Sequence, residues 1–200
     1  MTTLLLVRHG PTRWNREKRY LGDTDQELLP GAEASIRRLA ETVAGYDPEI
    51  FYTSPLKRAR QTAALIRARV RRPVRVSHLL REMAFGQWEG RTAEELIAAK
   101  DPAYLDWLQG GAMRPPGGES FDQFSRRLER FVQRCLRRHT NQVVGVVAHA
   151  GSLRLILLKA LGLSREHFFQ FEIQPASLSV IRCFDTGQAR LGCLNVTADG

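Results

Sequence analysis

Two histidines, His9 and His149, lie where this chain could hold reactive groups. His9 follows the apolar stretch 4–7 and Arg8, and His149 follows the apolar stretch 143–148. Short runs of large apolar residues are typical of strands buried on both faces, and ligands bind outside the carboxyl ends of such strands in open α/β sheets. An imidazole beside a guanidinium at that edge suits an anion held next to a nucleophile or an acid–base group.

These residues also have two simpler explanations. Arg8 and His9 could be solvated polar residues at a strand end, and a pair of histidines could ligate a metal ion. The sequence holds no His-Glu-x-x-His motif and no carboxylate cluster at ligand spacing, so we predict no metal site. If the two apolar strands are parallel neighbours, both imidazoles emerge at one edge of the sheet, an arrangement that chance would rarely produce.

Two further charged residues follow predicted strands. Arg58 lies about one turn into a helix that follows the stretch 50–53, and a helix N-terminus favours anions. Glu82 follows the stretch 74–76, and apolar residues after it would exclude water from a carboxyl that acts as a general acid. The alternative for Glu82 is a surface salt bridge with Arg81.

The elements that would position these residues alternate along the chain. Strands are expected at 4–7, 50–53, 74–76, 143–148, 177–184 and 189–196, and helices at 31–44, 54–69 and 120–139 and after residue 149. The alternation predicts a parallel sheet, and the final hairpin makes one edge antiparallel. We therefore predict an α/β fold, a three-layer α/β/α sandwich with a mainly parallel sheet, an antiparallel edge and a small helical cap.

Local signals mark where several helices begin. Ser54 is expected to cap the helix 54–69, with proline at its first position. Capping boxes begin at Thr92 and Ser120, on either side of a glycine- and proline-rich loop at 110–118. We expect residues 1–200 to form one domain, with residues 83–120 as a cap-like insertion.

Composition restricts the class of protein without choosing a ligand. The chain has 200 residues, of which 43% are hydrophobic and 26% charged, and its 30 basic and 21 acidic residues give a net charge of +9. This balance favours phosphorylated metabolites, nucleic acid or an acidic surface equally. Three cysteines without a Cys-x-x-Cys pair predict reduced thiols in a cytoplasmic protein. We expect no secretion signal and no membrane partner.

Several blocks, in order from residue 4 to about residue 161, resemble the histidine phosphatase superfamily, also called phosphoglycerate mutase-like. The first is Arg-His-Gly at 8–10 with Thr12 and Asn15, and the second is Thr-Ser-Pro-Leu-x-Arg-x-x-Gln-Thr at 53–62. The third is Arg-Glu at 81–82 before Phe-Gly and Trp-Glu-Gly, and the fourth is the strand-end His149. As a set, these motifs are very specific.

The resemblance implies a mixed α/β sandwich and a covalent phosphohistidine mechanism that needs no metal or other cofactor. It implies that His9 is the nucleophile and Glu82 the proton donor. Arg8, Arg58 and His149 would bind the transferring phosphoryl group. The further candidates for substrate contact are Asn15, Thr12, Gly22 and Ala150.

Within this family, the short acid-bearing segment resembles the phosphatase branch more than the mutases. The resemblance therefore implies a metal-independent phosphomonoesterase acting on a small phosphorylated metabolite, with α-ribazole-5′-phosphate as the first candidate. The alternatives are a phosphoserine, broad-specificity or sugar-phosphate phosphatase and, less favoured, a phosphoglycerate mutase. Leu21 stands where relatives often carry glutamine, which affects specificity. We expect Leu21, Trp88, Trp107 and the loop 110–118 to shape the pocket.

Two other classes remain as alternatives. A basic nucleic-acid-binding protein would explain the charge, but the arginines are scattered among glutamates and form no recognisable nucleic-acid-binding motif. A catalytically silent relative is disfavoured because the five central residues are all present. We expect no nucleic-acid partner and either a monomer or a homodimer.

Overall fold

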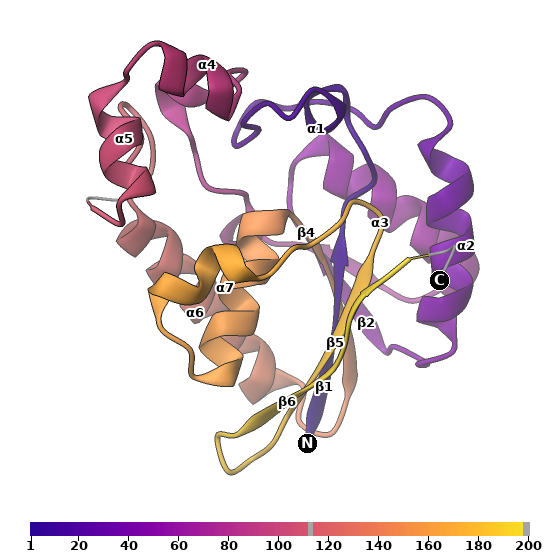
Figure 1. Cartoon of the computed structure of the whole chain (residues 1–200). Helices are drawn as coiled ribbons and strands as arrows, with labels where there is room; N and C mark the ends of the chain where they lie inside the picture. The colour runs from indigo at the N-terminus through magenta and orange to yellow at the C-terminus, as the bar shows by residue number, and fades with distance from the viewer. Residues whose placement is uncertain (112–113, 198–200) are drawn as a thin grey trace.

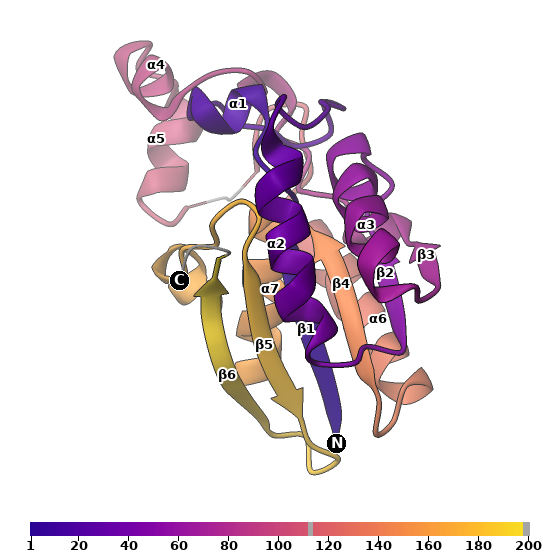
Figure 2. The ribbon, with the colours of Figure 1, turned by 90° about the vertical axis from the view of Figure 1, so that its right-hand side faces the viewer.

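A mixed sheet runs through the centre of the computed structural model, which describes residues 1–111 and 114–197. Its six strands lie in the order β3-β2-β4-β1-β5-β6 (Figure 2). The bounds are β1 (Thr2–Arg8), β2 (Ile50–Thr53), β3 (Val74–Val76), β4 (Val143–Ala148), β5 (Leu178–Cys183) and β6 (Ala189–Val196). Strands β1 to β4 are parallel to their neighbours within this group, whereas β5 is antiparallel to both β1 and β6. The predicted mainly parallel sheet with an antiparallel edge is confirmed.

Helices cover both faces of the sheet (Figure 1). On one face lie α2 (Ala32–Ala44) and α3 (Lys57–Val70), and on the other lie α6 (Phe121–Arg138) and α7 (Ala150–Leu161). The shorter elements are α1 (Arg13–Arg16), α4 (Ala93–Ala98), α5 (Pro102–Leu108) and the 3₁₀ turns η1 (His78–Leu80), η2 (Gly86–Trp88) and η3 (Arg165–Gln170). None of the helices in the described ranges has the length and apolar character needed to cross a membrane.

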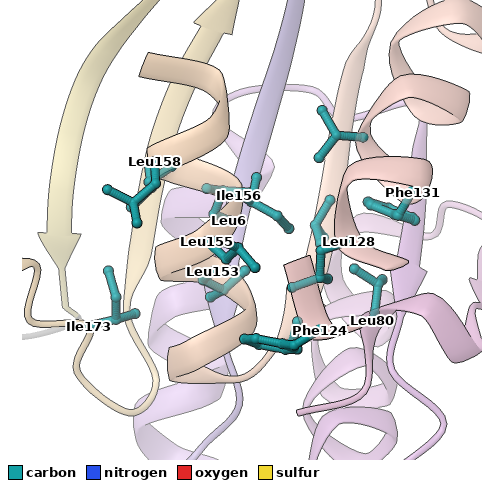
Figure 3. Close-up of a cluster of buried hydrophobic side chains, with 14 of the residues drawn as sticks. Leu6, Leu80, Phe124, Leu128, Phe131, Leu153, Leu155, Ile156, Leu158 and Ile173 are labelled. Atoms are coloured by element: carbon teal, nitrogen blue, oxygen red, sulfur yellow. The ribbon is translucent and has the colours of Figure 1, made fainter. Parts of the chain in front are cut away.

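The core on the α6–α7 face anchors the elements that carry the site. Phe124, Leu128 and Phe131 project from α6 along the stripe that their helical spacing predicts. Figure 3 shows these side chains beside Leu80 and Leu153, which come from η1 and α7. Since all five are buried, η1, α6 and α7 are packed together immediately next to Arg81, Glu82 and His149.

The predicted start of α3 is wrong. The helix begins at Lys57, and Ser54 and Pro55 stay outside it, because Leu56, the residue before the helix, has an extended backbone conformation. The backbone N–H of Ser54 continues the sheet pairing by donating to the carbonyl of Val147. The hydroxyl of Ser54 lies 2.7 Å from Nε2 of His149 and is therefore used in the site instead of in a helix cap.

Helices α4 and α5 lie above the carboxyl ends of the parallel strands, outside the two covering layers (Figure 1). Both predicted capping boxes are present, at Thr92 before α4 and at Ser120 before α6. The predicted pocket loop 110–118 contains residues 112 and 113, which lie outside the described residues, as do residues 198–200 of the predicted domain.

Candidate active site

The rings of His9 and His149 meet at the carboxyl edge of the sheet. Their centroids are 5.1 Å apart and their planes are tilted by 58°. β1 and β4 are adjacent and parallel, with Arg8 opposite Ala148, so each strand delivers its histidine to the same place. Both side chains are buried, with 2% and 1% of their surface exposed. The predicted meeting of the two imidazoles is confirmed.

The ring of His9 is held in one tautomer. Its Nδ1 lies 2.7 Å from the carbonyl oxygen of Gly10, which accepts a hydrogen bond from it. The lone pair therefore resides on Nε2. Burial, together with the positive charges of Arg58 and Arg8, holds the pKa of His9 well below its usual value. The imidazole is thus uncharged near neutral pH and keeps a free lone pair on Nε2.

The ring of His149 has both nitrogens engaged. It lies at the N-terminus of α7, where Nδ1 accepts from Nε of Arg58 at 3.2 Å. This leaves the proton on Nε2, which donates to the hydroxyl of Ser54. Burial, followed by the charge of Arg58 and the neighbouring His9, also holds the pKa of His149 well below its usual value.

Two buried guanidinium groups surround the histidines. Arg58 donates from Nη1 to Thr24 O at 2.9 Å and from Nη2 to Gly22 O at 2.7 Å. Arg8 donates from Nη1 to the carbonyl of Ile173, and its buried Nε has no partner among the described residues. Burial lowers the pKa of both guanidiniums to about 10, so both remain cationic at neutral pH. This corner of the molecule is built to receive an anion.

The carboxyl of Glu82 lies at the start of α7, with 6% of the residue exposed. Its oxygens accept from the backbone N–H groups of Gly151 at 2.8 Å, Met83 at 3.0 Å and Ser152 at 3.1 Å. The alternative salt bridge between Glu82 and Arg81 is wrong, because Arg81 pairs with Asp23 at 2.9 Å instead. Glu82 is therefore held inside the site.

A cavity of about 340 Å³ opens onto Arg8, His9 and Glu82, whereas the buried side chains of Arg58 and His149 lie outside its lining. Its lining includes Arg8, His9, Asn15, Glu82 and Ala150, all of which the sequence predicts as site residues. The other lining residues are Lys18, Arg19, Tyr20, Leu21, Met83, Phe85, Ala93, Trp107, Phe124, Gly151, Arg154, Phe168 and Phe169. Charged groups for an anion and a largely aromatic wall thus share one cavity.

Two predicted contact residues take supporting positions instead of lining the cavity. Thr12 is fully buried and forms a capping box with Asn15 at the start of α1. Gly22 accepts the hydrogen bond from Arg58, and a Cβ added there would come within 2.2 Å of the carbonyl of Met83. Their contact with substrate remains a prediction.

The prediction that Trp88 shapes the pocket is wrong. The ring of Trp88 is fully buried and packs edge-on against Tyr104 and Trp107. The described part of the loop 110–118 also lies outside the cavity lining. Leu21 and Trp107 do line the cavity, as predicted.

Sequence reasoning missed Arg154. It lies on α7 four residues after Ala150, and this helical spacing places both residues on the cavity side. Its Nε donates to the carbonyl of Phe171 at 2.5 Å, and its guanidinium lies 5.8 Å from the ring centroid of Phe168. Burial lowers the pKa of Arg154, partly opposed by the charge of Glu82. The spacing from Ala150 was the signal that could have found it.

Known proteins resemble this chain in sequence and in fold. The Histidine phosphatase superfamily (branch 1) model matches residues 4–197. The chain is 32% identical over 200 residues to the adenosylcobalamin/alpha-ribazole phosphatase of Escherichia coli, covering 98% of this chain and 97% of the relative. It is 31% identical over 182 residues to phosphoserine phosphatase 1 of Hydrogenobacter thermophilus, covering 90% and 86%.

The crystal structure of the alpha-ribazole phosphatase from Shigella flexneri is also similar. It superposes with a TM-score of 0.86 at 29% identity, covering 97% of this chain and 96% of that one. The family match spans both histidines, the two buried arginines and the buried carboxyl. This chain belongs to the histidine phosphatase superfamily, branch 1.

Proposed function

We propose that this enzyme hydrolyses phosphoric monoesters of small metabolites through a phosphohistidine formed on His9. The observation that carries the proposal is the buried, uncharged ring of His9, fixed through Nδ1 and 5.1 Å from the ring of His149. The guanidiniums of Arg8 and Arg58 accompany these rings and contribute to lowering the pKa of His9. Phosphoryl transfer mainly requires such positioning and compensating charge.

In the first step, Nε2 of His9 attacks the phosphorus atom and the bond from phosphorus to the ester oxygen breaks. Glu82 gives its proton to the departing alkoxide, so the alcohol leaves neutral. In the second step, the carboxylate of Glu82 takes a proton from a water molecule that attacks the phosphohistidine. The phosphorus–nitrogen bond breaks, phosphate leaves, and both His9 and Glu82 return to their starting forms.

Arg8, Arg58 and His149 are proposed to bind the phosphoryl oxygens, with Asn15 as a supporting contact. The buried Nε of Arg8 has an unused N–H in the described structure. The N–H at Nε2 of His149, which points at the hydroxyl of Ser54 at 2.7 Å, is proposed to be shared with a phosphoryl oxygen in a bifurcated hydrogen bond while the ring keeps its orientation. None of these interactions requires a metal ion or another cofactor.

The cavity favours an ester whose alcohol carries a planar ring. Tyr20 contacts Phe85, Phe85 contacts Trp107 and Trp107 contacts Phe169, with ring centroids 5.0, 6.4 and 6.2 Å apart. Phe168 continues this arc, 5.1 Å from Phe169. Aromatic walls stabilise planar apolar groups by stacking and burial. We therefore place α-ribazole-5′-phosphate, the kind of substrate named for two relatives, before phosphoserine.

Several parts of the proposal extend beyond the site. Broad-specificity or sugar-phosphate hydrolysis remains the alternative, and mutase action is less favoured. The segment 83–120, which carries α4, α5 and the aromatic residues Phe85 and Trp107, is proposed to act as a cap over the substrate. The three cysteines are free thiols, which fits the proposed cytoplasmic location.

Turnover of p-nitrophenyl phosphate by wild type and His9→Gln tests the chemistry. We expect the wild type to keep its rate in EDTA and His9→Gln to lose at least about 10³-fold, since the nucleophile is gone. His78→Gln, a change at an exposed histidine, is the control and keeps the wild-type rate. A wild-type rate that returns only with added magnesium, or a normal rate in His9→Gln, would contradict the proposal.

A screen of esters then tests the substrate class. We expect the value of kcat/KM for α-ribazole-5′-phosphate to exceed those for phosphoserine and sugar phosphates. Of these esters, only α-ribazole-5′-phosphate has an alcohol with a planar ring that can pack against the aromatic side chains of the cavity. A higher value for phosphoserine would overturn the choice of substrate and leave the hydrolytic mechanism in place.

A further inference from the structure

Arg127, on α6, uses every hydrogen-bond donor of its guanidinium to hold the segment that carries Glu82. Nη1 donates to the carbonyls of Leu79 at 2.9 Å and Arg81 at 2.8 Å, and Nη2 donates to the carbonyl of Glu82 at 2.9 Å. The other two donors go to Glu119, from Nε at 2.9 Å and from Nη2 at 2.6 Å. A guanidinium has five N–H donors in a rigid fork, so this one is fully used.

The ion pair of Arg127 with Glu119 is shielded from water. The two side chains are only 14% and 17% exposed. Nine other ion pairs of the chain each have at least one partner more than 30% exposed. Glu119 also ties in the far end of the segment 83–120, since its N–H donates to the carbonyl of Ala84 at 2.9 Å. The two ends of the proposed cap therefore meet at Arg127.

The side chain of Glu82 is held separately, by α7. Gly151 and Ser152 present their N–H groups to its two oxygens, and the hydroxyl of Ser152 donates to the carbonyl of Arg81 at 2.9 Å. Glycine is required for this approach, because a Cβ on Gly151 would lie 2.5 Å from Oε1 of Glu82. The same helix carries His149 at its N-terminus, so α7 fixes the carboxyl relative to the imidazole.

We propose that Arg127, paired with Glu119, and Gly151 are positioning residues for proton transfer by Glu82. Arg127 fixes the backbone on both sides of the acid, and Gly151 leaves the space in which its carboxyl docks. Neither residue has a side chain that could touch the phosphoryl oxygens. Arg127 lies outside the cavity lining, and Gly151 lines the cavity but has no side chain. This inference rests on the proposed role of Glu82 as proton donor.

The packing around Arg127 explains how α6 can hold the acid in place. Leu80, two residues before Glu82, is fully buried against Phe124 and Leu128 of the same helix (Figure 3). The guanidinium of Arg127 itself lies 4.9 Å from the ring centroid of Phe124. Apolar packing thus anchors the segment on one side of Glu82, and the guanidinium fixes its carbonyls. Displacement of a reacting group by about 1 Å can cost 100-fold in rate.

Two esters separate proton transfer from the rest of the reaction. Benzyl phosphate has a poor leaving group that needs a proton, whereas 2,4-dinitrophenyl phosphate has a good leaving group that departs without one. Their kcat/KM values report the steps up to phosphoryl transfer to the enzyme, so slow hydrolysis of the phosphohistidine does not obscure the comparison. As a single substitution, Glu82→Gln should lower kcat/KM mainly for the benzyl ester, relative to the wild type.

We expect Arg127→Met to lower kcat/KM for benzyl phosphate by about 100-fold and for the dinitrophenyl ester by less than about threefold. Arg127→Lys should show a smaller loss with the same selectivity, because an ammonium cannot reproduce the fork. Arg126→Met, a change at an exposed arginine of the same helix, is the matched control and keeps wild-type values for both esters.

Gly151→Ala should also act selectively on the benzyl ester. Gly45→Ala is its control, because Gly45 has a φ of −62° and a Cβ there would meet only an ordinary contact of 3.4 Å. Glu119→Gln removes the charge that holds Arg127 and should give a smaller loss of the same kind. This variant keeps the shape of the side chain, so it provides a measurement even if Arg127→Met does not fold.

A double-mutant cycle gives the decisive comparison. In a Glu82→Gln background, Arg127→Met or Glu119→Gln should change kcat/KM for benzyl phosphate by no more than about twofold, since the group that they position is already inactive. Two results would overturn the positioning role alone, provided that Glu82→Gln itself lowers kcat/KM selectively for benzyl phosphate. One is an equal loss on both esters in the Arg127, Glu119 and Gly151 variants, and the other is a loss that adds fully to that of Glu82→Gln in the double mutants. Equal losses of kcat/KM on both esters in Glu82→Gln itself would overturn both the positioning role and the proposed role of Glu82 as proton donor.

Discussion

Arg58 donates from Nε to Nδ1 of His149 at 3.2 Å, which joins the α3 helix to the N-terminus of α7 inside the site. Because Arg58 uses its other nitrogens on the carbonyls of Gly22 and Thr24, its position is fixed from three directions. The imidazole of His149 is consequently fixed in both orientation and tautomer before any substrate binds. Such preorganisation is what a phosphoryl-transfer site needs most.

Removal of the hydroxyl that faces His149 should cost stability. In Ser54→Ala, Nε2–H of His149 loses the acceptor that lies 2.7 Å away and stays buried. An unsatisfied buried donor costs about 1–3 kcal/mol, so the free energy of unfolding in urea should fall by this amount. Ser125→Ala, a half-buried position on α6, is the control. An unchanged free energy in Ser54→Ala would show that this hydrogen bond is unimportant for stability.

The two histidines should make the protein less stable in mild acid. Their pKa values are held well below the ordinary 6.5 in the native state, so below pH 6.5 the unfolded chain binds protons there that the native chain does not. The free energy of unfolding should therefore fall as the pH decreases from 7 through 6. Urea unfolding measures this slope, which should flatten in the variant that combines His9→Gln with His149→Gln. An identical slope in that variant would assign the acid sensitivity to other groups.

Replacement of Arg58 should shift the pH dependence of the reaction. Burial is the main reason for the lowered pKa of His9, and the charge of Arg58 is the next. In Arg58→Met the pKa of His9 should rise, which moves the acidic limb of the profile of kcat/KM to higher pH, in addition to an overall loss of rate. A weaker enzyme with its acidic limb unmoved would mean that the limb does not report His9.

Phe169 should contribute to the choice of substrate. It is 57% exposed at the cavity, with its ring centroid 6.2 Å from that of Trp107. Phe169→Ala should raise KM for benzyl phosphate by about 2- to 10-fold, since aromatic contacts are worth about 0.5–1.5 kcal/mol, and should leave KM for phosphoserine nearly unchanged. Val76→Ala, at a similarly exposed residue of β3, is the control for both esters. Equal changes in KM for the two esters would argue against a stacked leaving group.

The sequence was sufficient to predict the layers and the strand ends that carry the two histidines. The stretches before His9 and His149 are apolar at every position except glycine, a pattern that a doubly covered central strand requires. Their meeting was predicted on the condition that the two strands are parallel neighbours, and the pairing of β1 with β4 fulfils that condition. Helix α6 was equally clear from its apolar stripe and the capping box at Ser120. These features depend on short segments and on simple periodicity.

The remaining features depend on contacts between distant segments, which no local pattern contains. Ser54 resembles a helix cap in sequence, but the hydroxyl is used by His149, 95 residues later. Trp88 resembles a pocket residue because it is near Glu82 in the chain, yet its ring packs inward against Tyr104 and Trp107. The hold of Arg127 on the acid-bearing segment is of the same kind, since it joins residues more than 40 positions apart.

The measurement that tests the central claim most directly is covalent labelling during turnover. Wild type is mixed with a substrate carrying labelled phosphorus, stopped in alkali to preserve phosphohistidine, and digested to locate the label. We expect the label on His9, formed and lost at least as fast as kcat, and no label in His9→Gln. Label on another residue, or full turnover in His9→Gln without any labelled intermediate, would contradict the account.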